Sequence, residues 1–333
     1  MNQKVIAFGE LLLRLSPPGY QRLVQAEQFE AVYGGSEANV CVTLACLGAD
    51  SYFVSKLPDN PLGHSANQHL RRYGVNTESM LWGGKRLGIY FAEAGFSQRA
   101  SQVIYDRADS SVSELRETEI AWETLLQDKD WFHITGITPA LGEGCAAAVL
   151  EGVKTAKKLG LTVSCDFNYR QKLWSPQRAG EVMAPILEQV DIVSGIGPVE
   201  AETIFGIRAT SSNTYQDLAS QLMDRFGFKQ VLNTLRKSQS ANRHLFSAWL
   251  FDGSTLYTAP EYALEIVDRI GGGDAFFGAL IYGQLSNYGP QKSLDFAVAA
   301  SVLKHTIPGD VNLVTLGEVE SLLQGDSMLR VQR

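Results

Sequence analysis

Hydrophobic positions recur with two different periods along the second half of the chain. Short apolar runs alternate with longer stretches in which apolar residues return every three or four positions, the spacing of a helix that buries one face. The short runs, which predict strands, are residues 131–134, 162–166, 192–194 and 230–234. The longer stretches, which predict helices, are residues 142–159, 176–189, 199–205 and 214–226. This alternation predicts an α/β fold with a central, mostly parallel sheet and helices on both faces.

The first third of the chain predicts a second, smaller sheet. Residues 11–15 and 22–33 read as exposed strands, and the alternating runs 87–94 and 101–108 predict a β-hairpin with a long loop. We group these pieces as a small antiparallel β lid. The predicted division is a lid of residues 11–33 and 81–111 and a core of residues 1–10, 34–80 and 112–333. Such a sheet can offer its second face to another chain, so we expect a homo-oligomer, at least a dimer through the lids.

The composition narrows the class of protein. Of the 333 residues, 45% are hydrophobic and 20% are charged, as in ordinary soluble enzymes, and no apolar run is long enough for a membrane span. The net charge of −7 argues against a nucleic-acid partner, because a phosphate backbone is bound by a surplus of Lys and Arg. The cysteines at positions 41, 46, 145 and 165 form no paired motif, which disfavours disulfides and zinc and favours a cytoplasmic location.

A glycine-rich segment near the C-terminus suggests phosphate chemistry. Gly271, Gly272 and Gly273 precede Asp274 and an apolar helix. Without Cβ atoms, the backbone N–H groups of such a turn can converge on an anion at a helix N-terminus. The Asp274 carboxylate could cap the helix or could take a proton from a substrate hydroxyl, and these two roles compete. Taken alone, the segment is better explained as a capped turn.

Two arginines follow predicted strands, where open parallel sheets bind their ligands. Arg107 follows one strand of the lid, and Arg170 follows the strand that ends near Asp166. The planar guanidinium binds a carboxylate through two hydrogen bonds and keeps its charge, so a net-acidic protein with an anionic substrate needs such groups. The alternative is that the two arginines form surface ion pairs with Asp106 and Asp166, which would contribute little.

A second motif changes the interpretation of the glycine turn. Residues 34–39 read Gly-Gly-Ser-Glu-Ala-Asn and open an apolar helix. Together with Asp268-x-x-Gly-Gly-Gly-Asp274, this motif resembles the two signatures of the ribokinase-like (PfkB) carbohydrate kinases, in the same order and over essentially the whole chain. Further segments, among them 8–18, 105–107 and 166–174, are most similar to 2-keto-3-deoxygluconate kinases.

The resemblance implies an ATP-dependent kinase with Mg²⁺, with K⁺ as a further candidate cofactor. It implies Asp274 as the catalytic base, with the amides of Gly271, Gly272 and Gly273 stabilising charge on the transferred group. The residues expected to bind the sugar acid are Gly34, Gly35, Asn39, Tyr90, Tyr105, Arg107, Arg170 and Asp310. Those expected to bind the nucleotide are Asn168, Thr234, Arg236, Gly271 and Gly273.

The chain departs from the family pattern in two places. Many relatives have Asn-x-x-Glu for Mg²⁺, and here residues 197–200 read Gly-Pro-Val-Glu. Glu200 could bind the metal through water or could simply lie at a helix start. Relatives also have a Gly-x-x-Gly after the strand that here ends near Arg236. Arg236 or Lys237 could contact the nucleotide phosphates in its place, or either could be a solvated loop charge.

Three functions follow from these patterns. The first is a kinase that phosphorylates the terminal hydroxyl of 2-keto-3-deoxygluconate, giving the 6-phosphate and ADP. The second is a related kinase for fructose, ribose, another sugar or a nucleoside, although a neutral sugar would leave Arg107 and Arg170 without a carboxylate. The third is a nonenzymatic sugar-acid binding protein on the same scaffold.

Overall fold

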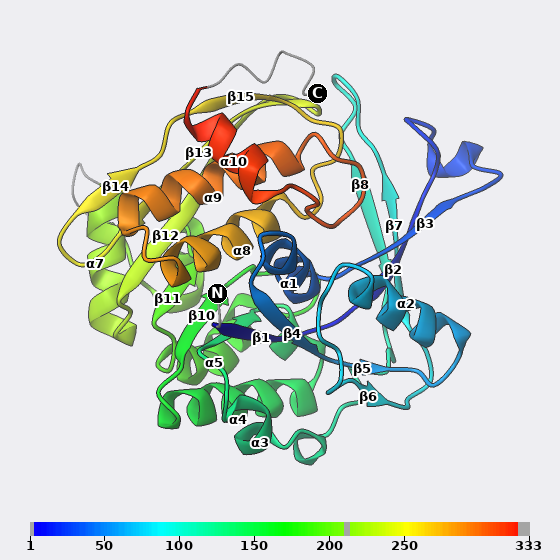
Figure 1. Ribbon diagram of the computed structural model, residues 1–333, viewed down its shortest axis with the longest axis horizontal. Helices are drawn as coiled ribbons and strands as arrows, with labels where there is room; N and C mark the ends of the chain where they lie inside the picture. The colour runs from blue at the N-terminus through cyan, green and yellow to red at the C-terminus, as the bar shows by residue number, and fades with distance from the viewer. Residues whose placement is uncertain (1–2, 210–213, 326–333) are drawn as a thin grey trace.

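A nine-stranded sheet forms the centre of the molecule in the computed structural model, which describes residues 3–209 and 214–325 (Figure 1). Its strand order is β14-β13-β12-β11-β10-β9-β1-β4, and β15 pairs with β13. The parallel part consists of β4 (Asp50–Val54), β1 (Lys4–Phe8), β9 (Trp131–Thr135), β10 (Thr162–Asp166), β11 (Ile192–Ser194) and β12 (Gln230–Ser240). The antiparallel part adds β13 (Arg243–Phe251), β14 (Leu256–Thr258) and β15 (Tyr262–Glu265). The predicted parallel sheet is confirmed, with this antiparallel edge as an addition.

Helices cover both faces of this sheet, as the alternating pattern predicts. One face packs against α3 (Trp122–Leu126), α4 (Glu143–Lys158), α5 (Pro176–Leu187), α6 (Pro198–Phe205) and α7 (Thr214–Phe226). The other packs against α1 (Ser36–Cys46), α8 (Gly272–Leu285), α9 (Pro290–Lys304) and α10 (Leu316–Leu323). α8 is apolar around nearly its whole circumference, because it is buried between α1, α9 and the sheet. This burial fixes the position of the glycine turn from which α8 begins.

The lid is a separate four-stranded sheet at the right of the molecule in Figure 1. Its order is β3 (Glu30–Gly34), β2 (Leu12–Ser16), β7 (Gly88–Glu93) and β8 (Gln102–Asp106). The predicted hairpin is confirmed, since β7 and β8 pair antiparallel. The expectation of a purely antiparallel sheet is wrong, because β2 and β7 pair parallel. Between these two strands the chain leaves the lid, passes through α1 and α2 (Pro61–Arg71) and returns in the same direction, which a parallel pair requires.

Two further details of the lid region differ from the prediction. Residues 22–33 are not continuous strand, because a short 3₁₀ helix, η1 (Leu23–Gln25), precedes β3. Residues 81–82 form β6 (Leu81–Trp82), which pairs with β5 (Lys56–Leu57) in a two-stranded sheet of its own. The division into core and lid stays a prediction.

The tip of the lid contacts the turn between β12 and β13 of the main sheet. The backbone N–H of Ala241, in the turn between β12 and β13, donates to the carbonyl oxygen of Ser97 at 2.8 Å. In return the N–H of Ser97 donates to Oδ1 of Asn242 at 3.1 Å. The β7–β8 loop therefore reaches across to the β12–β13 turn, and the space between the two sheets is bridged at this end.

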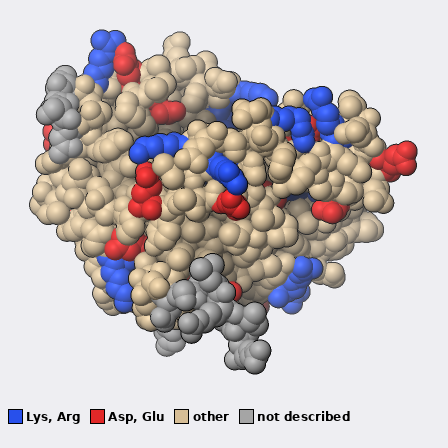
Figure 2. Space-filling view, turned by 90° about the horizontal axis from the view of Figure 1, so that it is seen from above, with Lys and Arg blue, Asp and Glu red and all other residues tan. Residues whose placement is uncertain are grey.

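The surface is mixed in charge. On the face shown in Figure 2, Lys and Arg side chains lie interspersed with Asp and Glu side chains. No helix within the described ranges has both the length and the apolar character that crossing a bilayer demands. All four cysteines are free thiols, and three of them are buried.

Candidate active site

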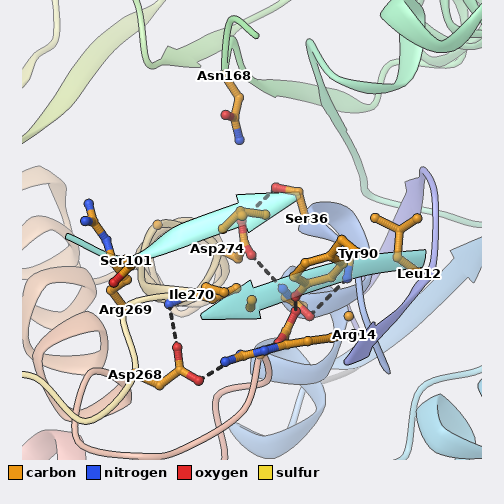
Figure 3. A pocket seen from close by; sticks show the side chains of 18 of the residues that line it. Leu12, Arg14, Ser36, Tyr90, Ser101, Asn168, Asp268, Arg269, Ile270 and Asp274 are labelled. Atoms are coloured by element: carbon orange, nitrogen blue, oxygen red, sulfur yellow. Dashed lines mark hydrogen bonds and ion pairs between the residues drawn. The ribbon is translucent and has the colours of Figure 1, made fainter. Parts of the chain in front are cut away.

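A cleft of about 630 Å³ lies between the lid and the carboxyl ends of the parallel strands. Figure 3 shows Arg14 and Tyr90 on one side, Asn168 on the opposite side and Asp274 between them. The predicted site residues that line this cleft are Gly34, Gly35, Asn39, Tyr90, Tyr105, Arg107, Asn168, Arg170, Glu200, Arg236, Gly271, Gly273, Asp274 and Asp310. The chain thus brings together positions that lie up to 276 residues apart, from Gly34 to Asp310.

Two predicted residues do not line the cleft. Thr234 lies inside β12, paired with Ala248 of β13, so its position belongs to the sheet. Gly272 is buried against α9, where an added Cβ would lie 2.3 Å from the ring of His305. The cleft-facing part of the turn is therefore formed by Gly271 and Gly273.

The glycine turn has the geometry of an anion-binding helix start. Gly271 has φ of 81°, in the left-handed region that favours glycine, and it precedes the first residue of α8. The hydroxyl of Ser301, from α9, donates to the carbonyl oxygen of Gly272 at 2.8 Å and fixes the turn from behind. The N–H of Gly272 reaches the carbonyl oxygen of Arg269 only at 3.5 Å, and those of Gly273 and Asp274 have no backbone partner among the described residues, so these two are free to bind an anion in the cleft.

Asp274 does not cap its own helix. Its carboxylate accepts hydrogen bonds from the hydroxyl of Ser36 and from Nδ2 of Asn39, each at 2.7 Å, and both donors belong to α1. Burial raises the pKa of Asp274 to about 6, although the two hydrogen bonds act to lower it. The two sequence motifs therefore meet at this carboxylate, and the competing interpretation of Asp274 as a helix cap is wrong.

Two further carboxylates lie near Asp274. Burial and the charge of Asp274 raise the pKa of Asp166, at the end of β10, to about 7. Glu37 is fully buried and accepts from the hydroxyls of Thr135 and Thr138 at 2.7 and 2.6 Å. This concentration of acidic groups favours protonation of one of them in the middle of the cleft. Sequence reasoning named neither residue as functional, although Glu37 stands inside the first motif.

The lid half of the cleft is defined by Glu10, Arg14, Tyr90, Arg107 and Asp310. Here charges are buried and paired. Nη1 of Arg14 lies 2.7 Å from Oδ2 of Asp268 and 2.9 Å from Oδ1 of Asp310, and the hydroxyl of Tyr90 donates to the other Asp310 oxygen. Gly34 must be glycine because a Cβ there would lie 2.0 Å from the Asp310 carboxylate.

Arg14 was missed by sequence reasoning. It lies within the exposed strand expected at residues 11–15, but its side chain is only 9% exposed and joins two carboxylates distant in sequence. The two carboxylates of Asp268 and Asp310 could have indicated Arg14, because buried carboxylates need a cation beside them.

Arg107 is paired, but not with its neighbour Asp106. Nη2 of Arg107 contacts Oε2 of Glu10, while Asp106 pairs with Arg86 at 2.8 Å. The guanidinium also lies 5.2 Å from the ring centre of Tyr105. Nε of Arg107 is buried in the cleft wall without a hydrogen-bond partner. The hydrogen-bonding capacity of this guanidinium is therefore not fully used by the protein.

The open half of the cleft is defined by Asn168, Arg170, Glu200, Arg236 and Arg269. Within the part of the chain that the structure describes, none of its three arginines has a carboxylate within ion-pair distance, so the expected alternative pair of Arg170 with Asp166 does not form. Partial burial and the charge of Arg269 lower the pKa of Arg236. Arg269 was not predicted, although it stands inside the glycine motif.

Oxygen donors that suit Mg²⁺ lie on this side as well. Glu200 is in the first turn of α6 and lines the cleft, as do Asp166 and Asn168. Nδ2 of Asn168 donates to Oδ2 of Asp166 at 3.3 Å, which places the two side chains together. Mg²⁺ is usually held by one or two carboxylates and by substrate phosphates, with water completing its coordination. The residues present fit such an ion.

The cleft thus combines an anion-binding turn, a carboxylate poised to accept a proton and arginines without partners, the parts of a phosphoryl-transfer enzyme. The family model for "pfkB family carbohydrate kinase" matches residues 2–314, so the chain belongs to the pfkB family of carbohydrate kinases. It is an ATP-dependent carbohydrate kinase with the ribokinase-like fold of that family.

The names of the relatives refer to different sugar substrates. The crystal structure of 2-dehydro-3-deoxygluconokinase from Thermotoga maritima is 45% identical with a TM-score of 0.94, and the match covers 98% of this chain and 99% of that one. A 2-dehydro-3-deoxygalactonokinase of Haloferax volcanii is 35% identical over 98% of both chains. Fructokinase-1 of Oryza sativa subsp. japonica is 30% identical over 97% of this chain and 98% of its own.

Proposed function

We propose that this kinase phosphorylates the terminal hydroxyl of 2-keto-3-deoxygluconate (2-dehydro-3-deoxygluconate), giving the 6-phosphate and ADP. The observation that carries the proposal is the incomplete pairing of two arginines that line the same cleft as Asp274. Arg107 has a buried Nε without a partner, and Arg170 has no carboxylate partner among the described residues. A substrate carboxylate would satisfy both groups. The name of the Thermotoga maritima relative supports the same substrate.

In this proposal Asp274 is the general base. Ser36 and Asn39 hold its carboxylate toward the cleft, and its pKa of about 6 leaves it ionised at neutral pH and still basic enough to accept a proton. It takes the proton of the sugar hydroxyl while that oxygen forms a bond to the γ-phosphorus of ATP and the bond to the leaving ADP oxygen breaks. The amides of the Gly271–Gly273 turn stabilise the charge on the transferred group.

Kinases of this family use ATP with Mg²⁺. We propose that Glu200, with Asp166 and Asn168 beside it, holds this ion through water. When bound, the ion neutralises charge on the phosphates. Arg236 and Arg269 contact the phosphates directly and take the place of the Gly-x-x-Gly amides found in relatives.

A second candidate is a neutral sugar such as fructose. One observation favours it: Glu10 already compensates the charge of Arg107, so an uncharged substrate would not leave that guanidinium alone. Arg170 has no carboxylate within ion-pair distance among the described residues and acts on Asp166 and Asp274 only at longer range, which is why we prefer the sugar acid. The galacto epimer, suggested by the Haloferax volcanii relative, would use the same two arginines. Family membership decides against a nonenzymatic binding protein.

The test is a panel of 2-keto-3-deoxygluconate, 2-keto-3-deoxygalactonate, fructose and ribose with Mg-ATP, in which ADP release is followed. We expect the highest kcat/KM for 2-keto-3-deoxygluconate and phosphorus at its O6 by NMR. A higher kcat/KM for fructose or ribose would overturn the proposal. The variant Asp274→Asn, run on the same panel, shows whether the ADP comes from this site.

We further propose a dimer formed through the lids, because the lid carries exposed apolar side chains at Val24, Phe29 and Ile104. The cytoplasmic location stays a prediction. A monomer in sedimentation equilibrium would rule out the dimer.

A further inference from the structure

Lys304, the last residue of α9, is fully buried at 0% exposure. Its ammonium donates to the carbonyl oxygen of Gly309 at 2.6 Å and to that of Ile307 at 3.2 Å. In the described ranges no carboxylate lies within ion-pair distance of Nζ. A buried Lys is uncommon, because removing an ammonium from water is costly unless other groups replace the water. Here backbone carbonyls do so.

The side chain lies directly beneath the glycine turn. A Cβ added to Gly271 would lie 3.2 Å from Cε of Lys304 and 1.8 Å from the carbonyl oxygen of Asp310. The chain that follows Lys304 therefore folds back against the turn. The ammonium holds this segment in place through its hydrogen bonds to the carbonyl oxygens of Ile307 and Gly309. Lys304 links the turn at Gly271 to Asp310 of the lid half.

Three carboxylates also act on the ammonium electrostatically. Burial lowers the pKa of Lys304, while the charges of Asp268, Asp310 and Asp274 favour its protonated form. Asp268 is tied to the same loop, because it accepts from the backbone N–H of Gly309 at 3.1 Å. Arg14 is a second cation near this group, and its charge acts to lower the pKa of Lys304. The site around Nζ therefore combines carbonyl oxygens at short range with negative charge at longer range.

Backbone carbonyls that replace a hydration shell are the environment in which proteins hold a bare monovalent cation such as K⁺. An ammonium group resembles that ion in charge and size. We propose that Lys304 is a tethered monovalent cation. It shapes residues 307–310 around the glycine turn and supplies a positive charge beneath it, so that phosphoryl transfer needs no added monovalent ion. The residues at this position do not fit K⁺, which the family resemblance had left as a candidate, because Lys304 already takes the place of the ion.

Lys304 is in this account a positioning residue, since it acts through Gly271 and Asp310. The proposal rests only on the kinase activity and not on the identity of the sugar. The test measures kcat and KM in tetramethylammonium buffers at constant ionic strength, with K⁺, NH₄⁺ or Li⁺ added in turn. The acceptor is whichever sugar the wild-type enzyme phosphorylates.

The wild-type enzyme is expected to show the same turnover with every cation. Lys304→Ala is expected to lose turnover by ~10²-fold in tetramethylammonium and to regain most of it, saturably, with K⁺ or NH₄⁺ but not with Li⁺. Lys292→Ala removes an exposed Lys of the same helix and is the matched control, with no expected change in any buffer.

Three results would overturn the proposal: wild-type turnover that depends on K⁺, full turnover of Lys304→Ala without any cation, or a loss that no cation restores. A readout without turnover comes from crystals soaked in rubidium chloride. Anomalous signal against the carbonyls of Ile307 and Gly309 is expected in Lys304→Ala and absent from the wild type. If Lys304→Ala does not fold, the wild-type enzyme decides the matter, because a rubidium peak there contradicts a tethered cation.

Discussion

The two halves of the cleft handle their arginines in opposite ways. In the lid half, Arg14 and Arg107 are nearly buried, and each is joined to at least one carboxylate from a distant part of the chain. In the open half, Arg170, Arg236 and Arg269 are exposed and have no carboxylate partner among the described residues. A paired, buried guanidinium organises the protein, whereas an unpaired one at a cleft is available to an anionic ligand. We therefore assign Arg14 to architecture and the open half to substrates. Arg107, which is paired with Glu10 but keeps one unpartnered donor, serves both.

The largest effect is expected where the two halves meet, at Asp274. Asp274→Asn keeps the size of the side chain and removes the base, so turnover should fall by ~10²-fold or more while the KM for the sugar changes little. Single-turnover kinetics measures this loss, and a melting temperature near that of the wild type serves as the control. Turnover close to that of the wild type would remove Asp274 from the mechanism.

The contrast between halves is tested next by comparing Arg14→Met with Arg236→Met. Removing Arg14 leaves the carboxylates of Asp268 and Asp310 without their cation, so the free energy of unfolding should fall by about 3 kcal/mol. Arg236 has no such partner, and its loss should change stability by less than about 0.5 kcal/mol. Urea unfolding measures both values. Equal destabilisation by the two substitutions would show that Arg14 and Arg236 do not differ in their contribution to stability.

The same Arg236→Met variant should weaken the binding of ATP and leave stability nearly unchanged. Loss of a charged contact to phosphate is expected to raise the KM for ATP by ~10-fold, with the KM for the sugar unchanged. Lys237→Met is the matched control, because Lys237 is exposed, pairs with Glu261 and does not line the cleft. An unchanged KM for ATP in Arg236→Met would make Arg236 a solvated surface charge.

The smallest expected effect is a shift in pH dependence. Asp274 must be ionised to accept a proton, and its pKa is about 6, so kcat/KM should fall as the pH drops through about 6. Asp310→Asn removes a negative charge that raises this pKa, so it should move this acid limb to lower pH. A pH profile of both enzymes from about pH 5 to 9 provides the measurement. A limb that stays in place would show that the Asp310 charge does not act on Asp274.

The sequence predicted the features that depend on local pattern. Alternating buried strands and amphipathic helices gave the parallel sheet, and the two motifs meet because α1 and α8 pack side by side. The hairpin of β12 and β13 was underestimated, because Lys237, Ser238 and Gln239 are exposed on successive positions and show no alternation.

The pairs in the lid half could not be predicted in this way. Arg14 and Asp310 lie 296 residues apart, and no periodicity connects them. The alternative pair of Arg107 with Asp106 does not form, because adjacent residues of an extended strand point to opposite faces. Partners of a buried charge are set by the tertiary fold, which short-range patterns do not describe.

The preference for an acid over a neutral sugar decides the substrate assignment, and it is measured as the ratio of kcat/KM for 2-keto-3-deoxygluconate to that for fructose. We predict that the wild-type enzyme prefers the acid and that Arg170→Met lowers this ratio by ~10-fold or more, because the carboxylate loses its unpaired partner. Lys172→Met, an exposed neighbour outside the cleft, should leave the ratio unchanged. A wild-type preference for fructose, or a ratio that Arg170→Met does not alter, would contradict the account.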